Sequence, residues 1–91
     1  MGAASQRISI LLEDGLVTLN RAVGVLRRRN VPVADVTVGP SGTVGVSCLS
    51  FTSPIDAAAV ERVVQQFRKT IGVRDVLVTA ADGGNHKGGA P

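Results

Sequence analysis

Two spacings of apolar residues alternate along this chain. Over residues 6–12 apolar side chains occupy every second position, whereas from Thr18 onward they recur at steps of three and four. A period of two is typical of a half-buried strand, and a period of three to four is typical of a helix. The pattern therefore predicts a strand over 6–12. It also predicts a helix with Thr18 as its N-cap that Asn30 and Pro32 stop.

Three further segments have the spacing of strands, namely residues 33–38, 43–51 and 73–79. Residues 39–42 lie between the first two and have the Gly, Pro and Ser composition of a turn. A turn at this point joins two strands as a hairpin. The last segment is apolar enough to be buried on both sides or to pair with a second chain.

A second helix is predicted between the last two strands. Ser53 suits the N-cap position and Pro54 the first helical position, where its missing N–H costs nothing. Apolar residues follow at steps of four from Ile55 to Phe67, and Gly72 closes the segment.

The order of these elements is strand, helix, strand, strand, helix, strand, with short connections. This order predicts an α+β fold, the ferredoxin-like βαββαβ sandwich, in which two helices cover one face of a four-stranded antiparallel sheet. Right-handed crossovers place the first and third strands in the centre. Residues 6–80 form the expected domain, residues 1–5 a flexible N-terminus and residues 81–91 a disordered, glycine-rich tail.

Composition limits the possible partners. The chain has 91 residues, of which 44% are hydrophobic, a high share for one small domain. Apolar surface left over after folding favours a dimer or a larger partner. Phe51 and Phe67 are the only aromatic residues, so the sheet lacks the aromatic platforms on which RNA-binding modules stack bases.

The net charge of +3 owes much to one cluster, Arg27 to Arg29. These residues fall at the predicted end of the first helix, where cations stabilise the negative end of the helix dipole. A protein-docking patch and a nucleic-acid contact are the alternatives.

The side chains offer no catalytic set. Cys48 has no second cysteine to pair with, and His86, the one histidine, lies in the expected tail. Glu13 and Asp14 are adjacent carboxylates at a loop entry, which is an arrangement for a helix dipole rather than for acid–base catalysis. We expect no enzyme activity, no metal site and no cofactor. We also expect no membrane span and a cytoplasmic location, because no signal peptide or long apolar run is present.

One junction could bind a small carboxylate. The loop between the first strand and the first helix presents free backbone amides at the positive end of a helix dipole, and Gly15 gives it conformational freedom. A plain connecting turn is the alternative.

Four segments resemble one known family. They are residues 8–14 (ISILLED), 19–26 (LNRAVGVL), 35–40 (DVTVGP) and 72–76 (GVRDV). In this order and spacing they are similar to the ACT domain of the small regulatory subunit of acetohydroxyacid (acetolactate) synthase, in its short, ACT-only type. The match covers about residues 7–80.

The resemblance implies a function. ACT domains of this family pair edge to edge into one continuous sheet and bind amino-acid effectors at the interface. The small subunit docks on the thiamine-diphosphate-dependent large subunit, activates it and often confers inhibition by valine. By position, the family's effector contacts correspond to Asp14, Gly15, Leu16, Val17 and Thr18 of one chain and to Val31, Pro32 and Val33 of its neighbour.

Three of these positions depart from the family pattern. Asp14 stands where the family has Asn, Val17 where it has Gly, and Pro32 where it has a second Asn. Asp14 adds negative charge near a ligand carboxylate, and Pro32 has no backbone donor. The resemblance therefore implies a homodimeric, non-catalytic subunit in branched-chain amino acid biosynthesis with a weak or altered valine response. The alternatives are a stand-alone amino-acid sensor acting on another enzyme and a nucleic-acid-binding domain that uses Arg27 to Arg29.

Overall fold

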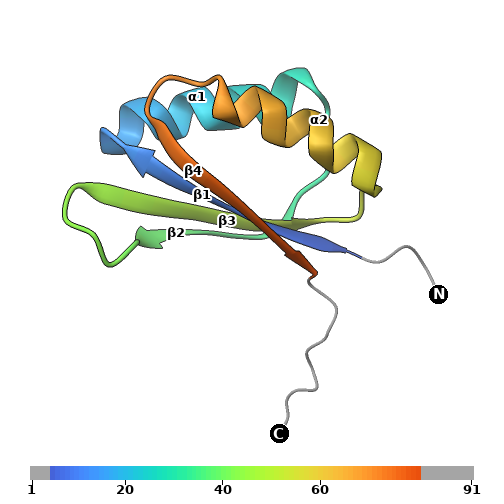
Figure 1. Cartoon of the computed structure of the whole chain (residues 1–91), viewed down its shortest axis with the longest axis horizontal. Helices are drawn as coiled ribbons and strands as arrows, with labels where there is room; N and C mark the ends of the chain where they lie inside the picture. The colour runs from blue at the N-terminus through green and yellow to red at the C-terminus, as the bar shows by residue number, and fades with distance from the viewer. Residues whose placement is uncertain (1–4, 81–91) are drawn as a thin grey trace, which may run out of the picture.

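The computed structural model describes residues 5–80, and Figure 1 shows their arrangement. The elements are β1 (Gln6–Glu13), α1 (Gly15–Arg28), β2 (Ala34–Pro40), β3 (Val46–Ser53), α2 (Ala57–Arg68) and β4 (Val73–Ala80). The four strands form one antiparallel sheet, and both helices lie on the same face of it. The predicted ferredoxin-like βαββαβ sandwich is confirmed. The predicted tail, His86 included, and all of the predicted flexible N-terminus except residue 5 lie outside the described residues.

The strand order is β2-β3-β1-β4, so that β1 and β3 are central as predicted. Residues of β1 at even positions face the helices, and Ile8 and Ile10 stand opposite Phe51 and Leu49 of β3. Because the side-chain period of a strand is two, this register turns every second apolar residue toward the core. β2 and β4 are the edges.

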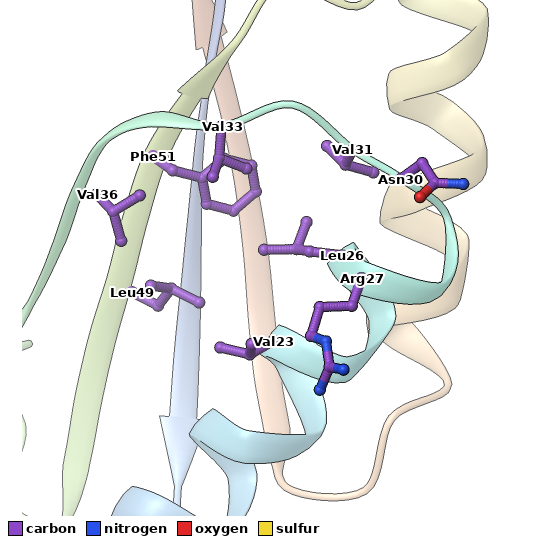
Figure 2. Close-up of a pocket in the computed structure, with 9 residues that line it drawn as sticks. All are labelled: Val23, Leu26, Arg27, Asn30, Val31, Val33, Val36, Leu49 and Phe51. Atoms are coloured by element: carbon purple, nitrogen blue, oxygen red, sulfur yellow. The ribbon is translucent and has the colours of Figure 1, made fainter.

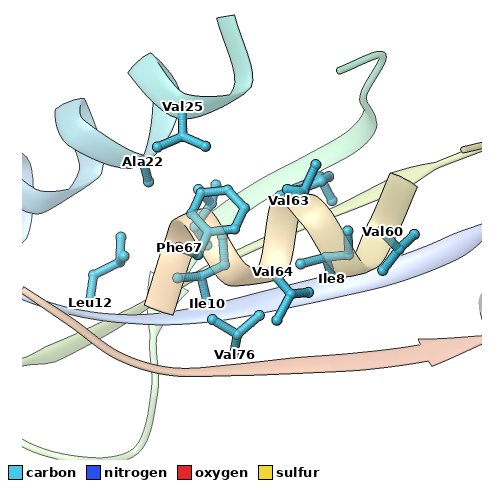
Figure 3. Packing of buried hydrophobic residues seen from close by; sticks show 12 residues of the cluster. Ile8, Ile10, Leu12, Ala22, Val25, Val60, Val63, Val64, Phe67 and Val76 are labelled. Carbon is cyan, nitrogen blue, oxygen red and sulfur yellow. The ribbon is translucent and has the colours of Figure 1, made fainter. Parts of the chain in front are cut away.

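The core lies between the sheet and the two helices. Figure 3 shows Phe67 of α2 above Ile10 of β1, with Val25 of α1 and Val76 of β4 nearby. Phe67 and Phe51 are the largest fully buried side chains. The predicted apolar faces of both helices are therefore the faces that pack on the sheet.

The predicted start of the first helix is wrong. α1 begins at Gly15, one turn earlier than expected, and Asp14 rather than Thr18 is its N-cap. Asp14 and Gly15 both have positive φ, of 60° and 47°, so the chain turns sharply from β1 into α1. Aspartate and glycine tolerate this left-handed conformation. The Thr18 side chain is fully buried.

The predicted cap of the second helix is also wrong. Ser53 is the last residue of β3, and its hydroxyl donates to the carbonyl of Pro32 at 2.6 Å. Asp56 is the N-cap, and its carboxylate accepts from the amide of Ala59 at 2.8 Å. Pro54 precedes the helix.

β3 and β4 differ most from what the sequence predicts. β3 starts at Val46 rather than at residue 43, because Gly42 and Gly45 both have positive φ and lengthen the turn after β2. β4 is an edge strand in which Val76 alone is buried, while Leu77 and Val78 are exposed. Of the two sequence-based options for this strand, burial on both sides is excluded.

The sheet face away from the helices is mainly polar. Ser9 of β1 and Ser50 of β3 stand opposite each other, and their hydroxyls are 2.9 Å apart. Cys48 lies beside them, with its Sγ 3.5 Å from the Ser50 hydroxyl. This partly exposed thiol is free.

Candidate functional site

An apolar hollow lies where the helices leave the edge of the sheet uncovered. Its volume is about 540 Å³, and Figure 2 shows the residues around it. The side chains come from the C-terminal half of α1, from the connection to β2, and from β2 and β3: Val23, Leu26, Arg27, Asn30, Val31, Val33, Val36, Leu49 and Phe51. α1 packs on β1 and β3, and Val36 and Val38 of β2 are left largely uncovered.

A bulge turns β2 toward the hollow. The pairing of β2 with β3 gains one residue between Ala34 and Thr37, and Asp35 within this interval has a positive φ of 51°. Beyond the bulge Val38 stands opposite Leu49, a buried residue on the helix side. Val36, two residues earlier, shares that side. Val36 and Val38 remain 53% and 52% exposed, which is high for valines beside a core.

The C-terminal end of α1 forms the wall of the hollow opposite β2. The amide of Val31 donates to the carbonyl of Leu26 at 3.0 Å, and the amide of Asn30 donates to that of Arg27 at 3.2 Å. Asn30 itself has a φ of 52°. These are the bonds of a Schellman motif, which reverses the chain after a helix and packs the following apolar residue back onto it. Val31 therefore packs against the core, while the side chain of Asn30 stays at the rim.

A hydrogen bond from the end of β3 fixes the connection from α1 to β2. The bond from the Ser53 hydroxyl to the Pro32 carbonyl ties this connection to the end of β3. Val31 and Val33, on either side of Pro32, are thereby both placed at the hollow.

The lining suits a small aliphatic ligand with one charged end. Most of it is valine, leucine and phenylalanine, while Arg27 and Asn30 add a guanidinium and a carboxamide at the rim. Pockets for small molecules are mostly apolar with a few polar groups that orient the ligand. A guanidinium pairs well with a carboxylate, and a carboxamide oxygen can accept from an ammonium group.

The eight predicted effector residues fall in two places. Val31 and Val33 line the hollow, and Pro32 lies between them. Residues 14–18 lie at the opposite end of α1, which has 14 residues and is therefore about 20 Å long. One chain does not bring the two sets together.

The first turn of α1 is exposed except at one position. Leu16 is 80% exposed and Val17 is 55% exposed. Both follow the sharp turn at Asp14 and Gly15, where the Val17 amide donates to the Asp14 carbonyl at 3.1 Å. Thr18 points inward instead and is 0% exposed. Leu16 and Val17 are thus free to contact another molecule.

Arg27 and Asn30 were missed as site residues. Their positions at the end of the first helix already gave each residue a structural role. Arg27 was interpreted as a cation that stabilises the helix dipole, and Asn30 as a residue that stops the helix. Arg27 does lie in the last turn, and Asn30 does end the helix. For Arg27 the available signal was its spacing of four residues from Val23, since residues three to four apart share a helix face. Asn30 lies beyond the end of α1, where helical spacing gives no signal.

Within residues 5–80 no three His, Cys, Asp or Glu side chains are close enough to hold a metal ion. Neither α1 nor α2 is long and apolar enough to cross a membrane.

Comparison with known proteins identifies the fold. No family model matches the sequence. The structure is similar to the ACT domain of GTP pyrophosphokinase from Chlorobium tepidum, with a TM-score of 0.70, 17% identity and coverage of 84% of this chain and 97% of that one. It is also similar to the uncharacterized protein TM1266 from Thermotoga maritima, with a TM-score of 0.70, 13% identity and coverage of 86% and 96%.

A third similar structure is the C-terminal domain of the MgtC protein from Mycobacterium tuberculosis. The TM-score is 0.69, the identity is 15% and the coverage is 94% of this chain and 96% of that one. At such identities the similarity concerns the fold. Residues 5–80 of this chain have the ferredoxin-like fold that is found in ACT domains.

Proposed function

We propose that this chain is a regulatory ACT domain that binds a small amino acid between two copies of itself, and that it serves as the small subunit of acetolactate synthase. The observation that carries the proposal is the hollow at the uncovered β2 edge, which contains Val31 and Val33 at the predicted effector positions. The resemblance of residues 8–14, 19–26, 35–40 and 72–76 to the synthase subunit supports the choice of enzyme.

A second copy would complete the site. A two-fold axis normal to the sheet pairs β2 with its copy in antiparallel fashion and extends the sheet across the interface. The same axis sets the two α1 helices antiparallel, because α1 is the helix nearer this edge. The exposed Leu16 and Val17 of one copy would then approach Arg27 and Val33 of the other.

The ligand in such a site is a free amino acid with an aliphatic side chain. Valines and leucines of the hollow receive its side chain, and Arg27 pairs with its carboxylate. With the carboxylate at Arg27, Asp14 of the second copy would lie near the ammonium group rather than near the carboxylate, which is the position that the family pattern implies. The presence of Asp14 in place of the family's Asn favours an altered rather than a lost response.

Reconstitution with an acetolactate synthase large subunit tests this function. We expect the two chains to co-purify, and we expect the activity of the large subunit to rise when this chain is added. An unchanged turnover with no co-purification would remove the synthase from the proposal.

A stand-alone amino-acid sensor is the second candidate, because the hollow and its rim by themselves fit an amino acid without reference to any enzyme. Calorimetry of the full chain against the twenty amino acids separates the two. A ligand with micromolar affinity combined with no effect on the synthase would favour the sensor.

A further inference from the structure

A furrow between α1 and α2 is lined by arginines. Three hollows follow one another along it, with volumes of about 440, 340 and 150 Å³. Arg28 lines the first and second hollows, and Arg29 lines the second and third. Arg21 joins at one end and Arg62 at the other. We call this surface, defined by Arg21, Arg28, Arg29 and Arg62, the arginine furrow.

Apolar side chains lie at the bottom of the arginine furrow, where Val25 and Val63 are buried and Val31 and Ile55 are half-buried. Val25 lines the first two hollows, and Val31, Ile55 and Val63 line the third. Arginine stands out among charged residues because it is enriched at protein–protein interfaces, where its stem covers apolar surface while its guanidinium binds carboxylates. The combination therefore suits a segment that presents both acidic and aliphatic side chains.

The positive charges of the furrow have no counter-charges in the described chain. None of the residues from 5 to 80 that line the three hollows is an Asp or a Glu. The two ion pairs found in this range are Arg68 with Asp75 and Arg74 with Glu13, both outside the furrow. Like charges placed close together repel, and carboxylates from a partner relieve that repulsion.

Local contacts keep two of the guanidiniums at the surface of α1. Arg21 donates from Nη1 to the carbonyl of Ile71 at 3.1 Å. Arg28 folds back along the helix, so that its Nη1 would lie 3.2 Å from a Cβ placed on Gly24. Gly24 has no side chain, and the guanidinium of Arg28 therefore has room beside the backbone of α1 at this position.

We propose that the arginine furrow binds an acidic segment of a partner protein in which aliphatic residues are interspersed among the carboxylates. A second copy of the chain does not fit, because a two-fold contact centred on the furrow would bring two arginine-lined surfaces together without a carboxylate between them. Nucleic acid offers phosphates to the walls but nothing to the apolar side chains at the bottom. If the proposed function holds, the partner is the catalytic large subunit of acetolactate synthase. The identity of the partner rests on the proposed function, whereas the binding of an acidic segment does not.

The first test uses an isotope-labelled full chain and a short peptide of glutamates interspersed with valines. We expect amide shifts confined to the arginine furrow, and we expect no binding of the matching peptide with glutamine in place of glutamate. Arg28→Glu should weaken binding roughly tenfold or more. Lys69→Glu is the matched control, because Arg28 ends α1 and Lys69 is the C-cap of α2, so both changes place a negative charge at a helix C-terminus.

Three results would overturn the proposal: equal binding of the glutamine peptide, equal effects of Arg28→Glu and Lys69→Glu, or tighter occupation of the furrow by duplex DNA than by the peptide. Arg21→Glu replaces Arg28→Glu should the latter chain fail to fold. The same variants are then assayed with the synthase large subunit. If the original chain does not act on that subunit, the proposed function fails, while the peptide titration still decides the role of the furrow.

Discussion

Thr18 in the first turn of α1 packs directly against Gly72 in the connection between α2 and β4. A Cβ placed on Gly72 would overlap the Thr18 hydroxyl, and Gly72 has a φ of 95°, which favours glycine. The carbonyl of Gly72 also accepts from the amide of Glu13 at 2.8 Å. The turn that carries the predicted effector residues 14–18 therefore packs against Gly72.

Replacement of this glycine tests the contact. Gly72→Ala introduces both an unfavourable φ and an overlap with Thr18, and we expect it to lower the free energy of unfolding by about 1–3 kcal/mol. Gly42→Ala is the control, since Gly42 has the same φ of 95° but no atom within contact distance of its added Cβ. Urea denaturation of both variants should show the larger loss for Gly72→Ala. Equal losses would mean that the overlap with Thr18 is relieved at no cost.

The buried hydroxyl of Thr18 leads to a second prediction. Within residues 5–80 it has no hydrogen-bond partner, and the side chain is fully buried. A buried polar group without a partner costs about 1–3 kcal/mol, so Thr18→Val, which keeps the shape, should raise the free energy of unfolding by about 1 kcal/mol. Thermal unfolding measures the change. A lower melting temperature would show that the hydroxyl is bonded.

Gly24 in the middle of α1 should tolerate a side chain. The nearest atom to its added Cβ is Arg28 Nη1 at 3.2 Å, the far end of a flexible side chain that can move. Alanine is a better helix former than glycine, and Gly24→Ala should therefore stabilise the fold by about 0.5–1 kcal/mol. Chemical denaturation of this variant and of the unchanged chain compares their free energies of unfolding. A less stable variant would show that the Arg28 side chain cannot move away from the added methyl group.

The comparison with sequence-based expectations shows where local rules suffice. The order of the elements follows from periodicity, because each apolar stripe fits one face only, and the central strands follow from right-handed crossovers. The helix starts were misjudged because both candidate side chains pack elsewhere. Thr18 packs on Gly72, and Ser53 donates to the Pro32 carbonyl. Tertiary packing of this kind is invisible to a capping rule that considers neighbours in sequence alone.

The site was predictable only in part, for a related reason. Val31 and Val33 are effector positions implied by a resemblance, and both line the candidate hollow. Arg27 and Asn30 join them only because α1 ends in a Schellman motif beside an uncovered edge strand. Which edge a helix leaves open depends on how the layers pack, and spacing along one helix does not reveal it.

Arg27 provides a prediction about the ligand. Loss of a charged hydrogen bond costs about 1.5–3 kcal/mol, so Arg27→Gln should weaken the binding of an aliphatic amino acid roughly tenfold or more. Calorimetry with valine, leucine and isoleucine measures it, and Lys69→Gln, which removes one positive charge outside the hollow, is the control. If both variants bind as the unchanged chain does, Arg27 does not hold the carboxylate.

Pairing through β2 is the claim on which the effector site depends, and sedimentation equilibrium of the full chain tests it most directly. We expect a mass twice that of one chain, and we expect Val36→Lys to give a folded monomer, because it places an ammonium group at an exposed position of this edge. Leu77→Lys, at a similarly exposed position of the opposite edge strand, should leave the dimer intact. A monomeric unchanged chain, or a dimer that Leu77→Lys breaks and Val36→Lys does not, would contradict the account.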